Sequence, residues 1–173
     1  NSSGKAKNYT VATATVPGHG PSVNVDFGTV PIQIGTGGEV FNIYDQMLLG
    51  VDYLALLNGS RPGADKSLAT AWSINGGSGG SSYAITSRTI LLRDSAGYDD
   101  TVILHEWSHY VTNNYSKSSS PGGTHYLSDC NEDLRLAFDE GRASSFGNMV
   151  RRHFGMTAAN VYFRTDGGSG PGR

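Results

Sequence analysis

The segment at residues 100–114 limits the possible folds of this chain more than any other part of it. It places His105 and His109 four positions apart, with Glu106 between them. Residues four apart lie on the same face of an α-helix, about one turn from each other. Apolar side chains fall on another side of the same helix, namely Ile103, Trp107 and Tyr110. The segment therefore predicts a helix that packs one face into a core and carries two imidazoles on another.

This arrangement suits a metal site. Two histidines four apart on a helix can both reach one zinc ion at about 2.0–2.1 Å. Glu106 lies at the edge of the same face, where its carboxylate reaches a water molecule rather than the metal and suits a general base. A domain of this length contains the His-Glu-x-x-His order (HExxH) by chance in well under about one case in a hundred at average composition. The alternative is an ordinary helix with two hydrogen-bonded histidines and a solvated glutamate.

Two further helices are predicted, one on each side of this segment. Apolar residues at helical spacing favour a helix over residues 39–58 that backs the core, with Thr36 and Glu39 as its capping box. The other helix begins after Asp129, which forms a capping box with Glu132, and reaches about residue 154. Its expected apolar stripe consists of Leu134, Phe138, Met149 and Val150.

Strand patterns occupy the intervals between these helices. Alternating and β-branched residues predict strands at residues 23–34, 67–75 and 83–93, the last as one long strand or two short ones. The order of strands, helix, strands, helix and helix, with no internal repeat, indicates an α+β fold. We expect a single domain over residues 21–166, an N-terminal arm at 1–20 and a flexible tail or linker at 167–173.

The composition of the chain restricts the binding partners that we expect and the cellular location of the protein. A length of 173 residues suits one domain, and a formal net charge of −2 offers no basic surface to nucleic acid or an anionic membrane. No run approaches the roughly 18 apolar residues of a membrane span. The 24 glycines outnumber the 13 lysines and arginines, which favours a secreted, extracellular protein. The two ends of the sequence favour a piece of a larger secreted precursor. The single cysteine, Cys130, excludes a disulfide scaffold and is either a small buried side chain or paired outside this chain.

Residues 102–111, which read VILHEWSHYV, resemble the active-site helix of the zincin metallopeptidases. Metzincins have a glycine three residues after the second histidine and a third histidine three residues later, whereas this chain has Thr112 and Tyr115 there. The resemblance is therefore to the gluzincins, the thermolysin-like branch. It implies a compact zincin-like domain with a twisted mixed sheet, a backing helix, an active-site helix and a glutamate helix.

The resemblance also implies a third metal ligand from a downstream glutamate, with a fourth position left open for water. Glu140 stands before Gly141 and Ala143 in a Glu-Gly-x-Ala context that resembles the gluzincin glutamate helix, where small residues allow a close approach to the active-site helix. The expected ligands of one catalytic zinc ion are His105, His109 and Glu140, with Glu132 or Asp139 as alternatives to Glu140. No pattern in the sequence indicates either the presence or the absence of a calcium site.

A metallopeptidase site also needs residues that orient the histidine ligands and a residue that stabilises the transition state. The outer ring nitrogens of ligating histidines are usually held by a polar neighbour, and Asp139 and Ser144 are the candidates. Gluzincins also use a tyrosine or histidine to stabilise the negative oxygen of the transition state. Tyr126, His125 and Tyr115 lie between the expected ligands and are candidates, although each can also be an ordinary surface residue.

The resemblance implies zinc-dependent hydrolysis of peptide bonds in a peptide or protein substrate, with Glu106 as general base. Part of residues 83–92 would hold the extended substrate through backbone hydrogen bonds. No upstream Gly-x-Met-x-Asn signature occurs, which favours an endopeptidase. The alternatives are a secreted non-catalytic binding or adhesion module that retains a zinc site, and hydrolysis of a non-peptide amide. An intact Glu106 argues against the module, because a structural zinc needs no base.

Overall fold

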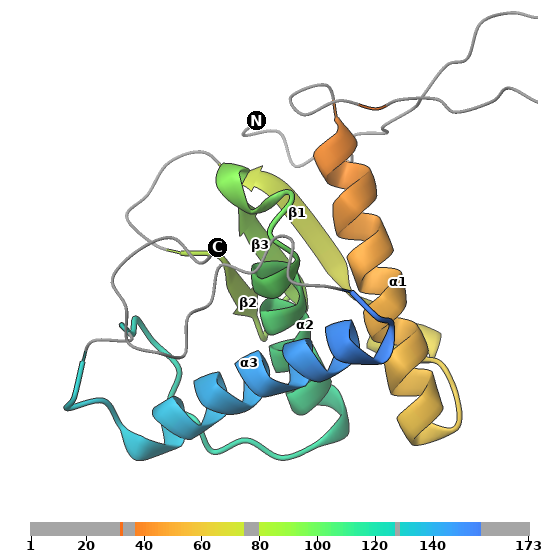
Figure 1. Ribbon diagram of the computed structural model, residues 1–173. Helices are drawn as coiled ribbons and strands as arrows, with labels where there is room; N and C mark the ends of the chain where they lie inside the picture. The colour runs from red at the N-terminus through yellow and green to blue at the C-terminus, as the bar shows by residue number, and fades with distance from the viewer. Residues whose placement is uncertain (1–31, 33–36, 75–79, 127–128, 157–173) are drawn as a thin grey trace, which may run out of the picture.

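The computed structural model describes residues 32, 37–74, 80–126 and 129–156 (Figure 1). The strand expected at residues 23–34, apart from residue 32, the N-terminal arm and the C-terminal tail lie outside these residues. The elements found are α1 (Gly38–Asn58), β1 (Ala69–Ile74), β2 (Ser82–Ala84), β3 (Thr89–Arg93), α2 (Asp100–Tyr115) and α3 (Leu134–His153), with short 3-10 turns at Ala64–Lys66 and Asp94–Ala96. The α+β class is confirmed. No described helix is long and apolar enough to cross a bilayer.

The three strands form a small mixed sheet. β3 is the middle strand and pairs in parallel with β1 and antiparallel with β2. The pattern at residues 83–93 therefore corresponds to two short strands, joined by a turn in which Arg88 adopts a left-handed φ of 49°. Ile90 and Leu92 alternate inward along β3 and join the main apolar core. This alternation places one face of the sheet against α2.

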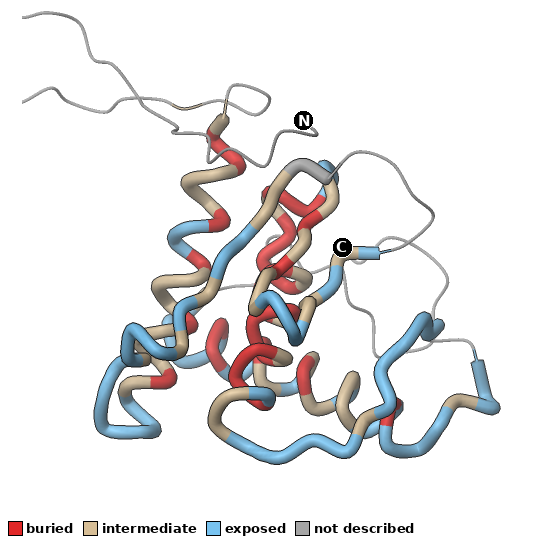
Figure 2. The backbone as a smooth tube through the Cα atoms, turned by 180° about the vertical axis from the view of Figure 1, so that it is seen from behind, coloured by how far each residue is buried: buried red, intermediate tan, exposed pale blue. Residues whose placement is uncertain are grey.

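Helix α2 occupies the centre of the molecule, in contact with α1, α3, β2 and β3 (Figure 1). Asp99 caps its N-terminus by accepting hydrogen bonds from the backbone N–H groups of Thr101 and Val102. Figure 2 shows buried segments concentrated along this helix. The predicted helix and its core side are confirmed, since the side chains expected to anchor it are buried: Ile103, Trp107 and Tyr110.

Helix α1 is confirmed in extent but differs from its prediction in detail. Gly37 is its N-cap, with a left-handed φ of 102° and no side-chain cap, and Thr36 of the predicted capping box lies outside the described residues. Tyr44, one of the helically spaced apolar residues of this segment, is 61% exposed and lies outside the core. A glycine sets the close packing instead: a Cβ atom on Gly50 would lie 2.7 Å from Cε2 of Trp107. The indole ring of Trp107 on α2 thus packs directly against the α1 backbone at Gly50.

Helix α3 begins later than its pattern suggested. Its N-cap is Asp133, whose carboxylate accepts a hydrogen bond from the backbone N–H of Arg135. The predicted capping box of Asp129 and Glu132 is therefore wrong, and Asp129 accepts from the Asn131 N–H in the preceding turn instead. Competing Asx turns at neighbouring aspartates explain the difference, because each offers the chain a similar local hydrogen bond.

The face that α3 buries also differs from the expected stripe. Of the expected stripe, Val150 is buried, whereas Leu134, Phe138 and Met149 are 85%, 73% and 46% exposed. The other buried residues of the helix are Leu136, Ala143, Gly147 and Arg151. Small residues face α2 because the two helices cross closely: a Cβ atom on Gly147 would lie 3.2 Å from the Leu104 carbonyl carbon. The close approach expected at Gly141 thus occurs at Gly147, while Ala143 is buried as expected.

Candidate metal centre

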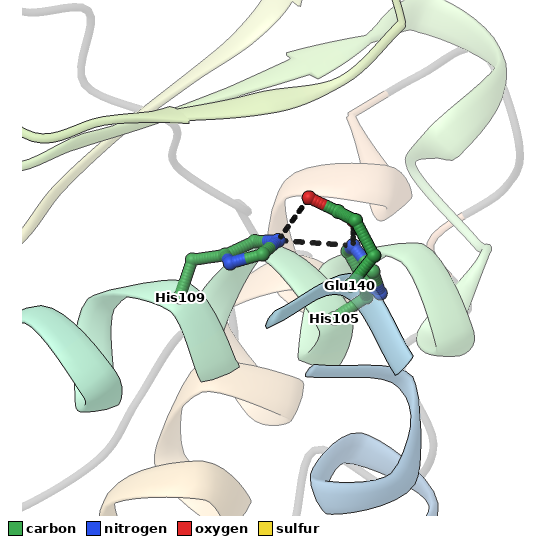
Figure 3. Close-up of side chains that lie close together, drawn as sticks. All are labelled: His105, His109 and Glu140. Carbon is green, nitrogen blue, oxygen red and sulfur yellow. Dashed lines mark hydrogen bonds and ion pairs between the residues drawn. The ribbon is translucent and has the colours of Figure 1, made fainter. Parts of the chain in front are cut away.

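The crossing of α2 and α3 brings two imidazoles and one carboxylate together (Figure 3). His105 Nε2 lies 2.9 Å from Glu140 Oε2, and His109 Nε2 lies 3.4 Å from Glu140 Oε1. The two Nε2 atoms are 3.1 Å apart. Among the described residues, these three form the group of histidine, cysteine and acidic side chains close enough to share one metal ion.

The outer nitrogens of both rings have defined neighbours. His105 Nδ1 lies 3.0 Å from Ser144 Oγ, and His109 Nδ1 lies 3.2 Å from Asp139 Oδ2. Asp139 is itself held by Arg142, which donates from Nη2 over 3.0 Å. Because an ionised carboxylate only accepts hydrogen bonds, a neutral His109 carries its proton on Nδ1 and keeps a lone pair on Nε2. That lone pair points at the centre of the three groups.

These separations fit a bound metal ion. Nitrogen and oxygen ligands at about 2.0–2.1 Å from a tetrahedral ion lie about 3.3 Å from one another. The observed separations run from 2.9 to 3.4 Å. Converging lone pairs of two imidazoles and a carboxylate repel each other unless a cation lies between them. The chemistry of this donor set therefore fits a metal ion held by His105, His109 and Glu140.

The ionisation of the ligands follows from their contacts. Burial alone would raise the pKa of Glu140, but the adjacent imidazoles of His105 and His109 outweigh it and hold this pKa well below its ordinary value. Burial alone would lower the pKa of His109, and the Glu140 carboxylate reverses this and raises it. The site therefore holds an ionised carboxylate against its two histidines, as a cation site requires.

Glu106 differs from the other carboxylates of the site. Its side chain is only 6% exposed, and it forms no hydrogen bond or ion pair with another residue in the described part of the chain. Burial raises its pKa, although both histidines of the cluster pull it down. It lines the same pocket as His105 and Glu140. A mostly buried carboxylate that lines an open pocket beside two imidazoles is placed to act on a ligand or a reacting group.

The three residues considered for transition-state stabilisation occupy different places. His125 lines the pocket, with Nε2 at 3.1 Å from Glu140 Oε2 and Nδ1 at 3.2 Å from the Gly123 carbonyl oxygen. Tyr126 also lines the pocket and is 66% exposed. Tyr115 packs against Tyr110 in the core and lies under the Lys66 ammonium, outside the pocket lining. The structure thus places His125 beside Glu140 and Tyr126 in the pocket lining, and leaves Tyr115 outside that lining.

The cluster opens into a pocket of about 530 Å³ between the start of α2 and the first half of α3. Glu132, an alternative third ligand, lines this pocket and is not part of the three-residue cluster. Asp139, the other alternative, contacts the outer nitrogen of His109 instead. Sequence reasoning missed Arg142, although its position three residues after Asp139 is typical of a helical ion pair.

The state of the single cysteine differs from one of its two interpretations. Cys130 is an exposed free thiol, so its interpretation as a small buried side chain is wrong.

Comparison of the chain with models of protein families, with curated protein sequences and with solved structures finds no match. A functional conclusion therefore depends on the geometry of the site and on the resemblance of residues 102–111.

Proposed function

We propose that this chain is a zinc-dependent metallopeptidase of the gluzincin type, built on a zincin-like domain and acting on extracellular peptides or proteins as an endopeptidase. One observation carries the proposal: the buried, unpaired carboxylate of Glu106 lines an open pocket beside three converging metal-binding groups. A structural metal site needs neither the pocket nor the extra carboxylate. Both are what hydrolysis at a metal requires.

Zinc is the ion that this donor set favours. Two imidazole nitrogens and one carboxylate oxygen are a common ligand set for a catalytic zinc ion, which keeps a fourth position open. The contacts of the two Nδ1 atoms with Ser144 and Asp139 support the proposal, because such contacts orient imidazole ligands and raise their basicity. Zinc bound there would polarise the scissile carbonyl group and lower the pKa of a water molecule to about 7.

Glu106 acts as the proton carrier in this proposal. Its carboxylate takes a proton from the attacking water as the water oxygen bonds to the carbonyl carbon. It then gives that proton to the nitrogen of the leaving amine, and the C–N bond breaks. Its raised pKa, caused by burial, suits both directions of transfer.

His125 is the best placed of the residues considered for stabilising the carbonyl oxygen as it becomes negative. It lines the pocket beside Glu140, and a hydrogen bond donated from its Nε2 would stabilise the negative charge that develops there. We expect His125→Ala to retain zinc and to lose about 10²–10³-fold in kcat. His153→Ala, at the exposed end of α3, is the matched control and should leave kcat unchanged.

The sheet topology restricts which part of residues 83–92 would bind the substrate in this proposal. Residues 89–92 belong to β3, which has β1 on one side and β2 on the other, so its backbone is already paired. Within residues 83–92, an extended peptide is left with the outer edge of β2, which has no partner among the described strands. This short strand contacts α2, the helix that carries the two histidines.

The decisive experiment compares wild type with Glu106→Gln, using zinc content and cleavage of an unfolded protein as readouts. Asp45→Asn, an exposed change on α1, controls for the loss of a carboxylate. We expect about one zinc per chain in all three proteins, and cleavage reduced by about 10²–10⁴-fold in Glu106→Gln alone. Zinc binding without cleavage in any of them would favour the rival proposal, a secreted binding module. Absence of zinc from wild type would overturn the metal site itself.

A further inference from the structure

A sequence motif outside the metal centre marks several asparagines as candidate carriers of a sugar chain. The sequon Asn-x-Ser/Thr, in which x is not proline, is the acceptor pattern for N-linked glycosylation of secreted proteins. It begins at Asn1, Asn8, Asn58 and Asn114 in this chain. The first two lie outside the described residues. The structure therefore distinguishes between Asn58 and Asn114 as sites of this modification.

The surroundings of the asparagine amide decide whether a folded chain can carry a glycan there. An N-linked glycan is bulky and hydrophilic, so it belongs on the surface. An amide that already donates a hydrogen bond beside aromatic rings has to give up these contacts before it can carry a sugar, and the partner that loses its donor makes this costly. A suitable site is therefore exposed and has an amide without a partner.

Asn58 meets both conditions. It is the last residue of α1, and Gly59 follows it with a left-handed φ of 77°, which turns the chain out of the helix. Asn58, Gly59 and Ser60 are all exposed. The preceding turn is also open to solvent, because Leu56 and Leu57 are 62% and 59% exposed. The Asn58 side chain forms no hydrogen bond within the described part of the chain, so its amide can accept a substituent.

The end of α1 that carries Asn58 lies away from the pocket beside the metal-binding cluster. No residue of α1 lines that pocket. The helix approaches it near its start, where Asn42 donates a hydrogen bond of 3.0 Å to the carbonyl oxygen of Gly97, the neighbour of the pocket residue Ala96. Asn58 follows Asn42 by 16 residues (58 − 42), which is about 24 Å along the helix axis. A glycan on Asn58 would leave the pocket accessible.

Asn114 is the opposite case. Its Nδ2 atom donates a hydrogen bond of 2.8 Å to the carbonyl oxygen of Tyr110 and lies 3.4 Å from the hydroxyl oxygen of Tyr83. The middle residue of its sequon, Tyr115, packs against the apolar core and against Tyr110. Tyr83 belongs to β2, the strand proposed to bind the substrate. A glycan on Asn114 would therefore disturb both the core contacts of α2 and the neighbourhood of β2.

We propose that Asn58 is an N-glycosylation site of this protein and that Asn114 stays unmodified. The donor is an oligosaccharide carried on a polyprenyl pyrophosphate of the secretory pathway. The Nδ2 atom of Asn58 bonds to the anomeric carbon of the sugar, the bond from this carbon to the pyrophosphate oxygen breaks, and the lipid pyrophosphate leaves. Nδ2 gives one proton to the solvent and keeps the other. The assignment depends on secretion of the chain and not on its proposed peptidase activity.

The test is secretion of the full chain from a yeast host that attaches N-linked glycans. Peptide N-glycosidase F removes such glycans and converts the asparagine that carried them to aspartate, so mass spectrometry of peptides reports on each sequon separately. We expect this conversion at Asn58 and none at Asn114. A sample without the glycosidase is the control, because an asparagine before a glycine, as at Gly59, can also lose its amide nitrogen spontaneously.

Two changes at the exposed Ser60 complete the test, since they leave Asn58 itself in place. Ser60→Thr keeps the sequon and should retain the glycan, whereas Ser60→Ala destroys the sequon and should abolish it. Secreted wild type without a glycan on Asn58 would overturn the assignment. A glycan on Asn114, or one on Asn58 that persists in Ser60→Ala, would overturn it as well.

Discussion

The two halves of α3 behave as different kinds of helix. The half after Glu140 is docked: Ala143, Gly147 and Val150 are buried against the neighbouring elements. The half before it is largely exposed, with Leu134 and Phe138 facing solvent. Glu140 lies where the two halves meet, so the docked half holds its backbone while its carboxylate faces an open pocket. Rigidity and access are supplied by adjacent turns of one helix.

The largest effect should follow from removing the carboxylate at the junction. Glu140→Gln replaces an anionic ligand by a neutral amide, and the two imidazoles alone hold a divalent ion weakly. We expect zinc affinity, measured by competition with a chromogenic chelator, to fall by more than about 100-fold. The fold should survive, because the carboxylate is not part of the apolar core. Unchanged zinc affinity would remove Glu140 from the ligand set.

A change in the docked half should affect stability. Gly147→Leu would drive a side chain into the Leu104 and His105 backbone, which an added Cβ already approaches at 3.2 and 3.3 Å. Overpacking of this kind lowers the free energy of unfolding by about 1–3 kcal/mol. Urea denaturation followed by circular dichroism would measure it. A variant as stable as wild type would show that the two helices do not pack as closely as described.

Asp139 tests the link between the ligands and their surroundings. Asp139→Asn keeps the shape of the side chain but weakens the acceptor for His109 Nδ1 and releases Arg142. Loss of such a contact lowers metal affinity by about 10–100-fold. The chelator competition used for Glu140→Gln measures this effect too. Asp133→Asn, at the N-cap of the same helix and away from the histidines, is the control that should not change zinc affinity.

At the start of the docked half, directly after Glu140, a change at the exposed Gly141 should stabilise the protein. Gly141→Ala replaces a helical glycine without a clash, so we expect the free energy of unfolding of metal-free protein to rise by up to about 1 kcal/mol. Gly141→Ala and Gly147→Leu should thus move stability in opposite directions. Destabilisation by Gly141→Ala would mean that the helix needs this glycine for its own packing.

The smallest effect is expected at the exposed apolar surface. Phe138→Ser removes a ring that is 73% exposed, and surface changes of this kind alter stability by no more than about 0.5 kcal/mol. Val150→Ala, in the docked half, should lower the free energy of unfolding by more than that, because Val150 is fully buried. Equal effects at both positions, measured by urea denaturation, would erase the distinction between the two halves.

Local patterns were sufficient wherever a helix carried its own strong periodicity. The extent of α2 and the inward positions of Ile103, Trp107 and Tyr110 could be predicted from residues 100–114. The apolar stripe of α3 could not, since Leu134 and Phe138 have helical spacing and still face solvent. Which side of a helix is buried depends on its neighbour, and α2 selects small residues rather than large apolar ones at the crossing.

The sequence by itself determined the α+β class, the helix that carries both histidines and the short list of acidic residues that could complete a metal site. These depend on spacing along one element, where the periodicity of the backbone fixes which side chains share a face. Only the tertiary structure decided that Glu140 meets His105 and His109, that Ser144 and Asp139 hold the outer ring nitrogens, and that His125 and Glu106 share the pocket while Tyr115 does not. Such contacts join residues far apart in the chain, and the close crossing of two helices at Gly147 sets their distances.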